Sequence, residues 1–207
     1  MDRDIFITDE RLPFSRMLDS RLTSAGYNVL LTSEGTSEKA IQWNRNTPFA
    51  LQQLNLQLKN KNMSLETAIL NFDALEFSKI YASNTLIAID KTCTELITAY
   101  ANLCLILRTI MIKQDRGRLI FVLRTPEAEQ LDNFALNMAI SAFITLAENT
   151  SLFFHSRRLP KLQSLLVRLE TPDQSSADWL ISQIELPVLS RNAGKWVRAG
   201  QRGLFSK

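Results

Sequence analysis

The chain has 207 residues, of which 45% are hydrophobic and 22% are charged, and its formal net charge is +3, so it fits one globular domain spanning residues 1–207. No run of about 18 apolar residues occurs, and Arg108 and Thr109 interrupt the longest apolar stretch, so we expect no membrane span. Two cysteines are too few for a disulfide scaffold and a single histidine cannot form a polyhistidine site, so we expect a reduced, cytoplasmic protein without a metal site.

The start of the chain shows the pattern of a strand, a helix and a second strand. Residues 4–8 form a short apolar run that is typical of a buried strand. Pro13 suits the first turn of a helix, which Gly26 ends. Residues 27–31 predict the next strand. Such a βαβ opening favours a parallel sheet with right-handed crossovers.

The rest of the chain continues this alternation. The strand at residues 49–56 is predicted because Leu51, Leu54 and Leu56 alternate with polar residues. The expected further strands are residues 67–71, 119–123, 165–169 and 196–197, and the expected helices are residues 33–46, 86–114, 131–149 and 177–184. This pattern predicts the α/β class: a single doubly wound, Rossmann-like domain of about seven mostly parallel strands with helices on both faces.

Five segments match, in chain order, the landmarks of one known family. They are residues 8–30, residues 69–74 (Ile-Leu-Asn-Phe-Asp-Ala), residues 111–120 (Met-Ile-Lys-Gln-Asp-Arg-Gly-Arg-Leu-Ile), residues 172–173 (Pro-Asp) and residues 194–203. They resemble the opening βαβ unit, the Asn-Asn-Ala-Gly segment, the helix-to-strand junction, the Pro-Gly turn and the final strand of the short-chain dehydrogenase/reductase (SDR) family. The resemblance implies a Rossmann fold that binds NAD or NADP and catalyses hydride transfer.

The chain departs from this family in the loop that holds the cofactor phosphates. Where the family's Thr-Gly-x-x-x-Gly-x-Gly loop has glycines, this sequence has Asp9, Pro13 and Ser15. Glycines let backbone N–H groups approach a pyrophosphate, whereas Asp9 places a carboxylate there and Pro13 lacks an N–H. Alternatively, Asp9 and Pro13 only cap and begin the helix. We predict no NAD or NADP binding in the usual pose, and a degenerate cleft that consists of Thr8, Asp9, Pro13, Ser15, Asn71, Phe72 and Asp73.

The residues that the resemblance assigns to catalysis are also replaced. The family uses a tyrosine, a lysine four residues later, a serine and an asparagine, and the tyrosine exchanges a proton with the substrate as hydride moves. The matching positions are Phe134, Met138, Arg124 and Leu96. None of the three tyrosines is followed by a lysine four residues later, and phenylalanine and methionine cannot exchange a proton. We therefore expect no catalytic residue at these positions.

Two connections are expected to be short. Ten residues, near residues 57–66, separate the predicted strands 49–56 and 67–71, which is too few for a full crossover helix and its loops. Near residues 173–178, few residues remain where the family inserts a substrate lid. The sequence therefore predicts a fold that is retained without its usual site.

Two long helices form the predicted partner surface. Residues 86–114 are apolar nearly all round, and the resemblance implies that this helix and residues 131–149 join subunits in the family. One face must cover the sheet, so the excess of apolar side chains predicts a homodimer or homotetramer. Alternatively, the helix is buried within a monomer.

The other polar features are weaker candidates. His155 has no acidic neighbour in the sequence, and Arg157, Arg158 and Lys161 form a small basic cluster that either meets an anion or is solvated. Residues 190–207 hold five bases and no acid. They either contact nucleic acid, an anionic lipid surface or an acidic protein, or they finish the sheet and seal an oligomer contact. Because the rest of the chain is slightly acidic, we do not expect nucleic-acid binding.

Two function classes remain open. In the first, the protein is an SDR-like pseudoenzyme that acts as an oligomeric scaffold or as a binding protein for another protein. In the second, it is a diverged NAD(P)-dependent oxidoreductase or nucleotide-binding protein with a non-standard site, in which Arg124 contacts a phosphate. The combined loss of phosphate loop, catalytic pair and lid favours the first class.

Overall fold

Seven strands pair side by side in the computed structural model, which describes residues 4–35, 40–60, 65–126, 133–157, 159–189 and 194–200. Their order is β3-β2-β1-β4-β5-β6-β7, and all neighbouring strands are parallel. The order reverses between β1 and β4, which is where open parallel sheets bind ligands, beyond the carboxyl ends of the strands. The strands are β1 (Asp4–Ile7), β2 (Asn28–Ser33), β3 (Ile41–Gln42), β4 (Leu65–Asp73), β5 (Gly117–Arg124), β6 (Leu162–Arg168) and β7 (Trp196–Arg198).

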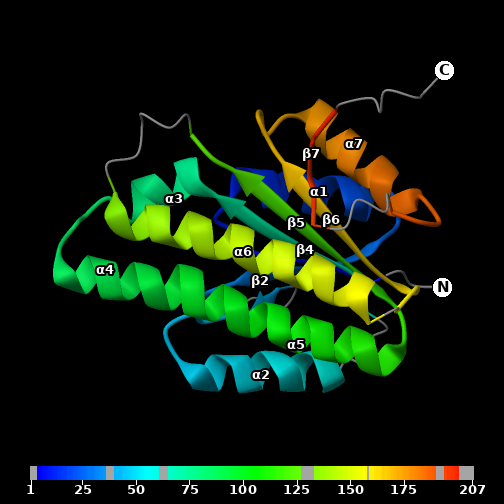
Figure 1. Ribbon diagram of the computed structural model, residues 1–207, viewed down its shortest axis with the longest axis horizontal. Coiled ribbons are helices and arrows are strands. Elements are labelled where there is room, and N and C mark those ends of the chain that lie inside the picture. The colour runs from blue at the N-terminus through cyan, green and yellow to red at the C-terminus, as the bar shows by residue number, and fades with distance from the viewer. Residues whose placement is uncertain are drawn as a thin grey trace.

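Helices cover both faces of this sheet (Figure 1). The helices are α1 (Pro13–Ser24), α2 (Pro48–Asn60), α3 (Ala74–Ile80), α4 (Leu86–Thr92), α5 (Ala99–Gln114), α6 (Phe134–Ser156) and α7 (Gln174–Glu185), and a π-helical turn, η1 (Cys93–Thr98), joins α4 to α5. α1 and α7 lie on one face, and α2 to α6 lie on the other. The doubly wound α/β fold predicted from the sequence is therefore confirmed.

The strands are buried on both faces because their apolar side chains alternate between two cores. In β4, Ala68, Leu70 and Phe72 face the core under α5 and α6, and Ile69 faces the core under α1 and α7. The larger core holds a cluster of aromatic rings in which Phe143 of α6 lies 4.9 Å from Phe72, between ring centroids. These continuous apolar runs are typical of parallel strands covered on both sides.

The helix expected at residues 33–46 is wrong. Ile41 and Gln42 form β3, and the Trp43 amide donates to the carbonyl of Ser33 at 2.7 Å. Ile41 and Trp43 are both buried in the larger core. Side chains two residues apart share a face in a strand and not in a helix, so their spacing follows the strand period.

The strand expected at residues 49–56 is also wrong, because these residues belong to α2. Leu54 and Leu58 are buried and Leu56 is exposed, which is the four-residue spacing of one helix face. The short crossover near residues 57–66 was expected only because residues 49–56 were assigned to a strand. In the structure, α2 is itself the crossover helix between β3 and β4. The connection between β2 and β3 spans residues 34–40, of which residues 36–39 lie outside the described part.

The two long helices predicted from the sequence are present with changed bounds. The stretch Leu86–Gln114 is helical throughout, but its centre is the π-helical turn η1. The helix expected at residues 131–149 begins at Phe134 and continues to Ser156, with residues 131–132 outside the described part. Residues 173–178, the expected site of the shortened lid, are the N-cap and first turns of α7, where the Asp173 carboxylate accepts from the Ser176 amide.

By length and composition alone, Leu86–Gln114 is apolar enough to cross a membrane, although the sequence contains no unbroken apolar run of that length. The helix is instead a layer of the domain. Tyr100, Leu103, Leu107 and Met111 of α5 are buried in the larger core. A core helix that covers a sheet on one side and a neighbouring helix on the other has the same composition.

Candidate functional site

Most of the predicted cleft residues meet where β1 and β4 end. The Asn71 amide donates to the Thr8 hydroxyl at 2.7 Å, and the Asn71 side chain donates to the Ser15 hydroxyl at 3.0 Å. Ser15 in turn donates to the Thr8 carbonyl at 2.7 Å. Thr8, Ser15 and Asn71 are fully buried. Hydrogen bonds among these three residues, through side chains and backbone, therefore tie the start of α1 to the ends of β1 and β4.

Asp9 is the next residue after Thr8, and its carboxylate is the centre of an ion-pair cluster. Its backbone has a φ of 65°, in the left-handed region that glycine adopts easily and aspartate only occasionally. The side chain is 3% exposed, and its Oδ2 lies 2.7 Å from Nη2 of Arg45. Arg11 contacts the same carboxylate from the other side, with Nε 3.0 Å from Oδ1. Two guanidinium groups therefore converge on one buried carboxylate.

Arg45 reaches Asp9 from the loop after β3. Its side chain is 1% exposed, and its guanidinium carbon lies 4.3 Å from the ring centroid of Trp43 and 5.4 Å from that of Tyr100. Stacking on aromatic faces favours a buried guanidinium. Burial alone would raise the pKa of the Asp9 carboxyl, but Arg45 and Arg11 together outweigh burial and lower it. Asp9 is therefore ionised at neutral pH.

The loop that would hold cofactor phosphates uses its own N–H groups internally. The amide of Asp9 donates to the Thr32 hydroxyl at 2.7 Å, and that of Glu10 donates to the Thr32 carbonyl. The amide of Arg11 donates to the Asp9 carboxylate, that of Leu12 donates to the Asp9 carbonyl, and Pro13 has no N–H. Dinucleotide sites instead aim such groups at the pyrophosphate, so the residues present do not fit NAD or NADP in the usual pose.

The sequence offered the alternative that Asp9 caps α1 and Pro13 begins it, and the structure shows only the second of these roles. Pro13 begins α1, as predicted, whereas the N-cap residue is Leu12 and no side chain caps the helix. Asp9 therefore does not cap α1. Its carboxylate accepts from Arg11 two residues later, as in an Asx turn, and otherwise serves the two guanidinium groups.

A second, smaller ion pair lies at the ends of β4 and β5. Asp73 is buried and caps α3 by accepting from the amides of Leu75 and Glu76. Nη1 of Arg124 lies 3.2 Å from Asp73 Oδ2, and its Nε has no partner within the described part of the chain. Arg124, at the position that matches the family's serine, thus neutralises Asp73.

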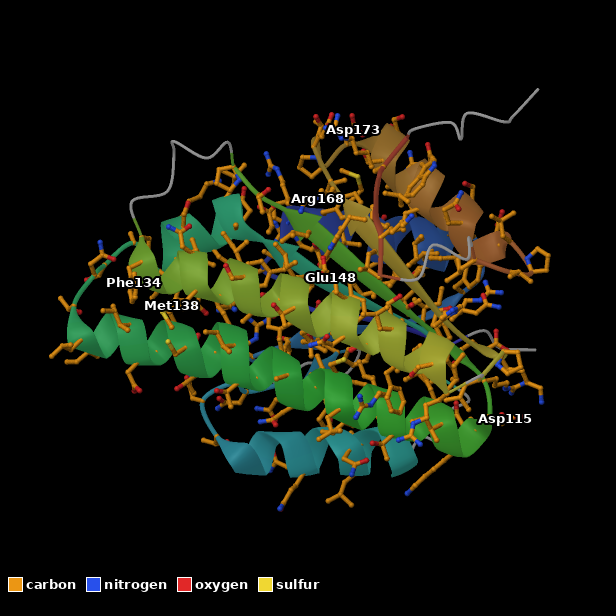
Figure 2. The ribbon with its side chains drawn as sticks, viewed as in Figure 1. Asp115, Phe134, Met138, Glu148, Arg168 and Asp173 are labelled. Atoms are coloured by element: carbon orange, nitrogen blue, oxygen red, sulfur yellow. The ribbon has the colours of Figure 1, made fainter. Side chains whose placement is uncertain are left out.

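The other positions that match the family's catalytic set lie apart from the Asp73–Arg124 ion pair. Phe134 and Met138 lie on the first turns of α6, where 67% and 41% of their surfaces are exposed (Figure 2). Leu96 lies in η1 and is buried in the larger core. The structure therefore brings Arg124 to the cleft, but not a proton-exchanging pair.

Sequence reasoning missed a buried pair that consists of Tyr81 and Glu95. The Tyr81 hydroxyl donates to the Glu95 carboxylate, and Lys91 lies 3.9 Å from that carboxylate. Burial and then this hydrogen bond raise the pKa of Tyr81, so its phenol stays protonated at neutral pH. The available signal was an acid directly before Leu96 and Ile97, within a helix that is otherwise largely apolar. Arg45 gave no such signal, because its contact with Asp9 depends on β3 lying beside β2.

The remaining predicted features lie away from the cleft. His155 is exposed in the last turn of α6, and Lys161 pairs with Asp115 at 2.6 Å; Arg158 lies outside the described residues. The expected last strand is β7, where Trp196 donates to Glu148 of α6 at 2.9 Å. Residues 190–193 and 201–207 of the basic segment lie outside the described part. Within the residues that the structure describes, no three His, Cys, Asp or Glu side chains cluster as a metal site would require.

Comparison with known proteins gives a sequence relative and several similar solved structures. No protein-family model matches the chain. It is 35% identical over 215 aligned residues to an uncharacterized protein of Treponema pallidum (strain Nichols), and the match covers 100% of this chain and 97% of that protein.

The structural matches have low sequence identity. A short-chain dehydrogenase from Streptomyces avermitilis has a TM-score of 0.73 at 10% identity, covering 97% of this chain and 89% of that chain. An apo SCOR enzyme from Clostridium thermocellum has a TM-score of 0.70 at 13% identity, covering 96% and 91%. A short-chain dehydrogenase from Leptospira borgpetersenii with bound NAD+ has a TM-score of 0.69 at 11% identity, covering 96% and 91%. The chain therefore belongs to one family with the Treponema pallidum protein, and its fold is that of the short-chain dehydrogenase/reductases.

Proposed function

We propose that this protein is an SDR-fold pseudoenzyme that acts as an oligomeric scaffold or binding protein. The observation that carries the proposal is the buried cluster of Asp9, Arg11 and Arg45 in the loop after β1. The cluster places a carboxylate where this fold class binds phosphates, and the loop amides bond internally. A dinucleotide phosphate would have to displace the Asp9 carboxylate from its two guanidinium partners.

The protonation chemistry of the cleft supports the same proposal. The SDR reaction needs a tyrosine that exchanges a proton near neutral pH. Burial raises the pKa of both Tyr81 and Tyr100. Tyr81 donates to Glu95, and Tyr100 donates to the Asn71 carbonyl at 2.7 Å. Both phenols therefore hold a protein acceptor and keep their protons.

Exposed apolar side chains on α4 and α6 support an oligomeric role. Leu86 and Ile87 at the start of α4 are 85% and 83% exposed, and Phe134 and Met138 lie exposed on the neighbouring helix α6. Large exposed apolar groups that gather on adjacent helices mark association surfaces. We propose that this four-residue surface, the α4–α6 face, joins copies of the chain into a homodimer or homotetramer.

The cofactor part of the proposal is tested by titrating the purified protein with NAD, NADH, NADP and NADPH. A ligand at about 100 times its Kd stabilises a protein by about 2.7 kcal/mol, which is roughly 5–11 °C in melting temperature for a chain of this size. We expect no heat of binding and no shift at millimolar concentrations. Micromolar binding would contradict the proposal and favour the diverged oxidoreductase. In that case Arg124→Met would show whether the ligand contacts the end of β5.

The oligomer part is tested by light scattering at micromolar concentration. We expect a dimer or tetramer for the wild type and a monomer for Phe134→Glu, because a buried, unpaired carboxylate opposes association. Leu56→Glu is the matched control: Leu56 is 55% exposed on α2, outside the α4–α6 face, so this variant keeps the wild-type mass. A monomeric wild type would refute the scaffold.

A further inference from the structure

Two guanidinium groups share the Asp9 carboxylate. Arg45 and Arg11 bring two positive charges to its single carboxylate, with Arg45 Nη2 2.7 Å from Oδ2 and Arg11 Nη2 3.2 Å from the same atom. Glu34, which is largely exposed, pairs with the outer side of Arg11 at 2.9 Å. Arg45 is the buried member and has Asp9 as its only ion-pair partner among the described residues.

Arg45 also has donor capacity that Asp9 does not use. Its Nε and Nη1 are buried and have no hydrogen-bond partner within the described residues. Buried guanidinium N–H groups normally find acceptors. A phosphate-type anion has more acceptor oxygens than a carboxylate, and such oxygens match the fork of a guanidinium.

The position of Arg45 does not depend on the anion that it binds. Trp43 and Tyr100 hold the guanidinium from two sides, at 4.3 and 5.4 Å, and their rings pack edge to face at a centroid distance of 5.5 Å. Tyr100 is anchored in turn by its hydrogen bond to the Asn71 carbonyl. A cation that is held by its own packing stays in place when its partner is removed.

Asp9 reaches this position under backbone constraint. Its φ is left-handed, and its amide donates to the Thr32 hydroxyl. This conformation directs the carboxylate to both guanidinium groups, where it excludes any other anion by occupancy and by charge.

We propose that Arg11 and Arg45 form an oxyanion receptor that the chain occupies with its own Asp9 carboxylate, as an autoinhibitory contact. The external ligand class that fits the receptor is a small phosphate-type anion. This inference rests on the proposed function, since it explains how the cleft became closed to phosphates.

The test removes the charge and keeps the shape. Asp9→Asn is isosteric, and asparagine tolerates the left-handed backbone. The variant leaves Arg45 without a counter-ion, so we expect its melting temperature to fall by roughly 6–20 °C. Inorganic pyrophosphate at about 100 times its Kd then restores roughly 5–11 °C, and it leaves the wild type unchanged.

Two control variants separate the receptor from general salt effects. Asp73→Asn removes another buried carboxylate that faces an arginine and caps a helix, so it lowers the melting temperature without rescue by pyrophosphate. Asp9→Asn combined with Arg45→Met removes the receptor and also shows no rescue. Equal rescue of all three variants would overturn the proposal, as would no rescue of Asp9→Asn.

The remaining outcomes distinguish the receptor proposal from the proposed function. If Asp9→Asn does not fold by itself, refolding with and without pyrophosphate replaces the melting curve, and recovery only with the anion supports the receptor. Failure to recover in both buffers overturns it. NAD or pyrophosphate binding by the wild type would contradict the proposed function. If the wild type binds neither NAD nor pyrophosphate and pyrophosphate does not restore the melting temperature of Asp9→Asn, only the receptor proposal is contradicted.

Discussion

Replacing Arg45 by methionine isolates the energetics of the buried ion pair. Methionine keeps an unbranched apolar stem against Trp43 and Tyr100 but removes the guanidinium that lies 2.7 Å from the Asp9 carboxylate. The change therefore leaves Asp9, which is 3% exposed, with Arg11 as its remaining ion-pair partner in the described chain. We expect Arg45→Met to fold and to be clearly less stable than the wild type.

The magnitude follows from two opposing terms. At 2.7 Å and an effective dielectric constant of about 20, the attraction between the two charges is about 6 kcal/mol. Removing two ions from water costs several kcal/mol for each ion, so the intact pair contributes little net stability. Removing one partner of a buried pair costs about 3–5 kcal/mol. Because Arg11 still contacts Asp9, we expect a loss near the lower end, about 3 kcal/mol.

Urea unfolding of four proteins measures this coupling. The set is the wild type, Arg45→Met, Asp9→Asn and the double variant, compared at one protomer concentration because association changes apparent stability. Each single variant loses about 3–5 kcal/mol, whereas the double variant loses much less than their sum, because it leaves no unpaired buried charge. Losses that add to within about 0.5 kcal/mol would show that the two side chains do not interact, and would refute the ion-pair description.

The pH dependence of the free energy of unfolding is an independent test of the Asp9–Arg45 ion pair. Asp9 has its pKa lowered in the folded state from an ordinary value of 3.8. Its stabilising contribution is therefore present above about pH 4 and is lost as the pH falls through the folded pKa. The destabilisation by Arg45→Met should be largest near pH 7 and should shrink below about pH 4. Destabilisation that grows on acidification would contradict this assignment.

Four further substitutions test core packing, backbone conformation and a buried hydrogen bond. Phe143→Ala should lower the free energy of unfolding by about 3–5 kcal/mol in urea, because it opens a cavity in the aromatic core. Gly117→Ala would place a Cβ 2.4 Å from Cγ of Met111, so it should cost roughly 1–3 kcal/mol for overpacking, beyond backbone strain. Gly26→Ala, also at positive φ but with open space, should cost only about 1–2 kcal/mol. Tyr81→Phe should cost about 1–3 kcal/mol by leaving a buried carboxylate without its donor.

The elements that could be predicted from the sequence are those with long or strongly marked patterns. The opening β1-α1-β2 unit has a proline at its helix start and a glycine at the turn that follows, and its predicted strands differ from the structure by a residue or two. The helix over residues 86–114 is long enough for its type to be unambiguous. Its π-helical turn η1 was not predicted, because it leaves the apolar pattern almost unchanged.

The region of residues 33–60 could not be predicted because its patterns are short and ambiguous. Leu51, Leu54 and Leu56 fit an imperfect alternation, and only the burial of Leu54 with Leu58 identifies the helix. Ile41 and Trp43 fit a strand of two residues, too short to stand out from a helical pattern. Tertiary contacts therefore decided both elements.

The sequence located the loop of the candidate site but not the arginine that completes it. Its loop could be located because Asp9 and Pro13 replace glycines at fixed offsets from the first strand. A buried aspartate requires a cation, but the sequence does not say which one. Arg45 lies 36 positions away and meets Asp9 only because β3 lies beside β2 in the sheet. That neighbour relation was missing once β3 had been assigned to a helix.

The polar groups at the switch point have a structural role. In an enzyme, the polar groups at the switch point stay available for ligands, which lowers stability in return for activity. Here Thr8, Asp9, Ser15 and Asn71 bond to the protein itself, so this edge contributes to the fold. The α4–α6 face instead exposes large apolar side chains. The scaffold role that we propose therefore rests on the α4–α6 face and not on the polar edge of the sheet.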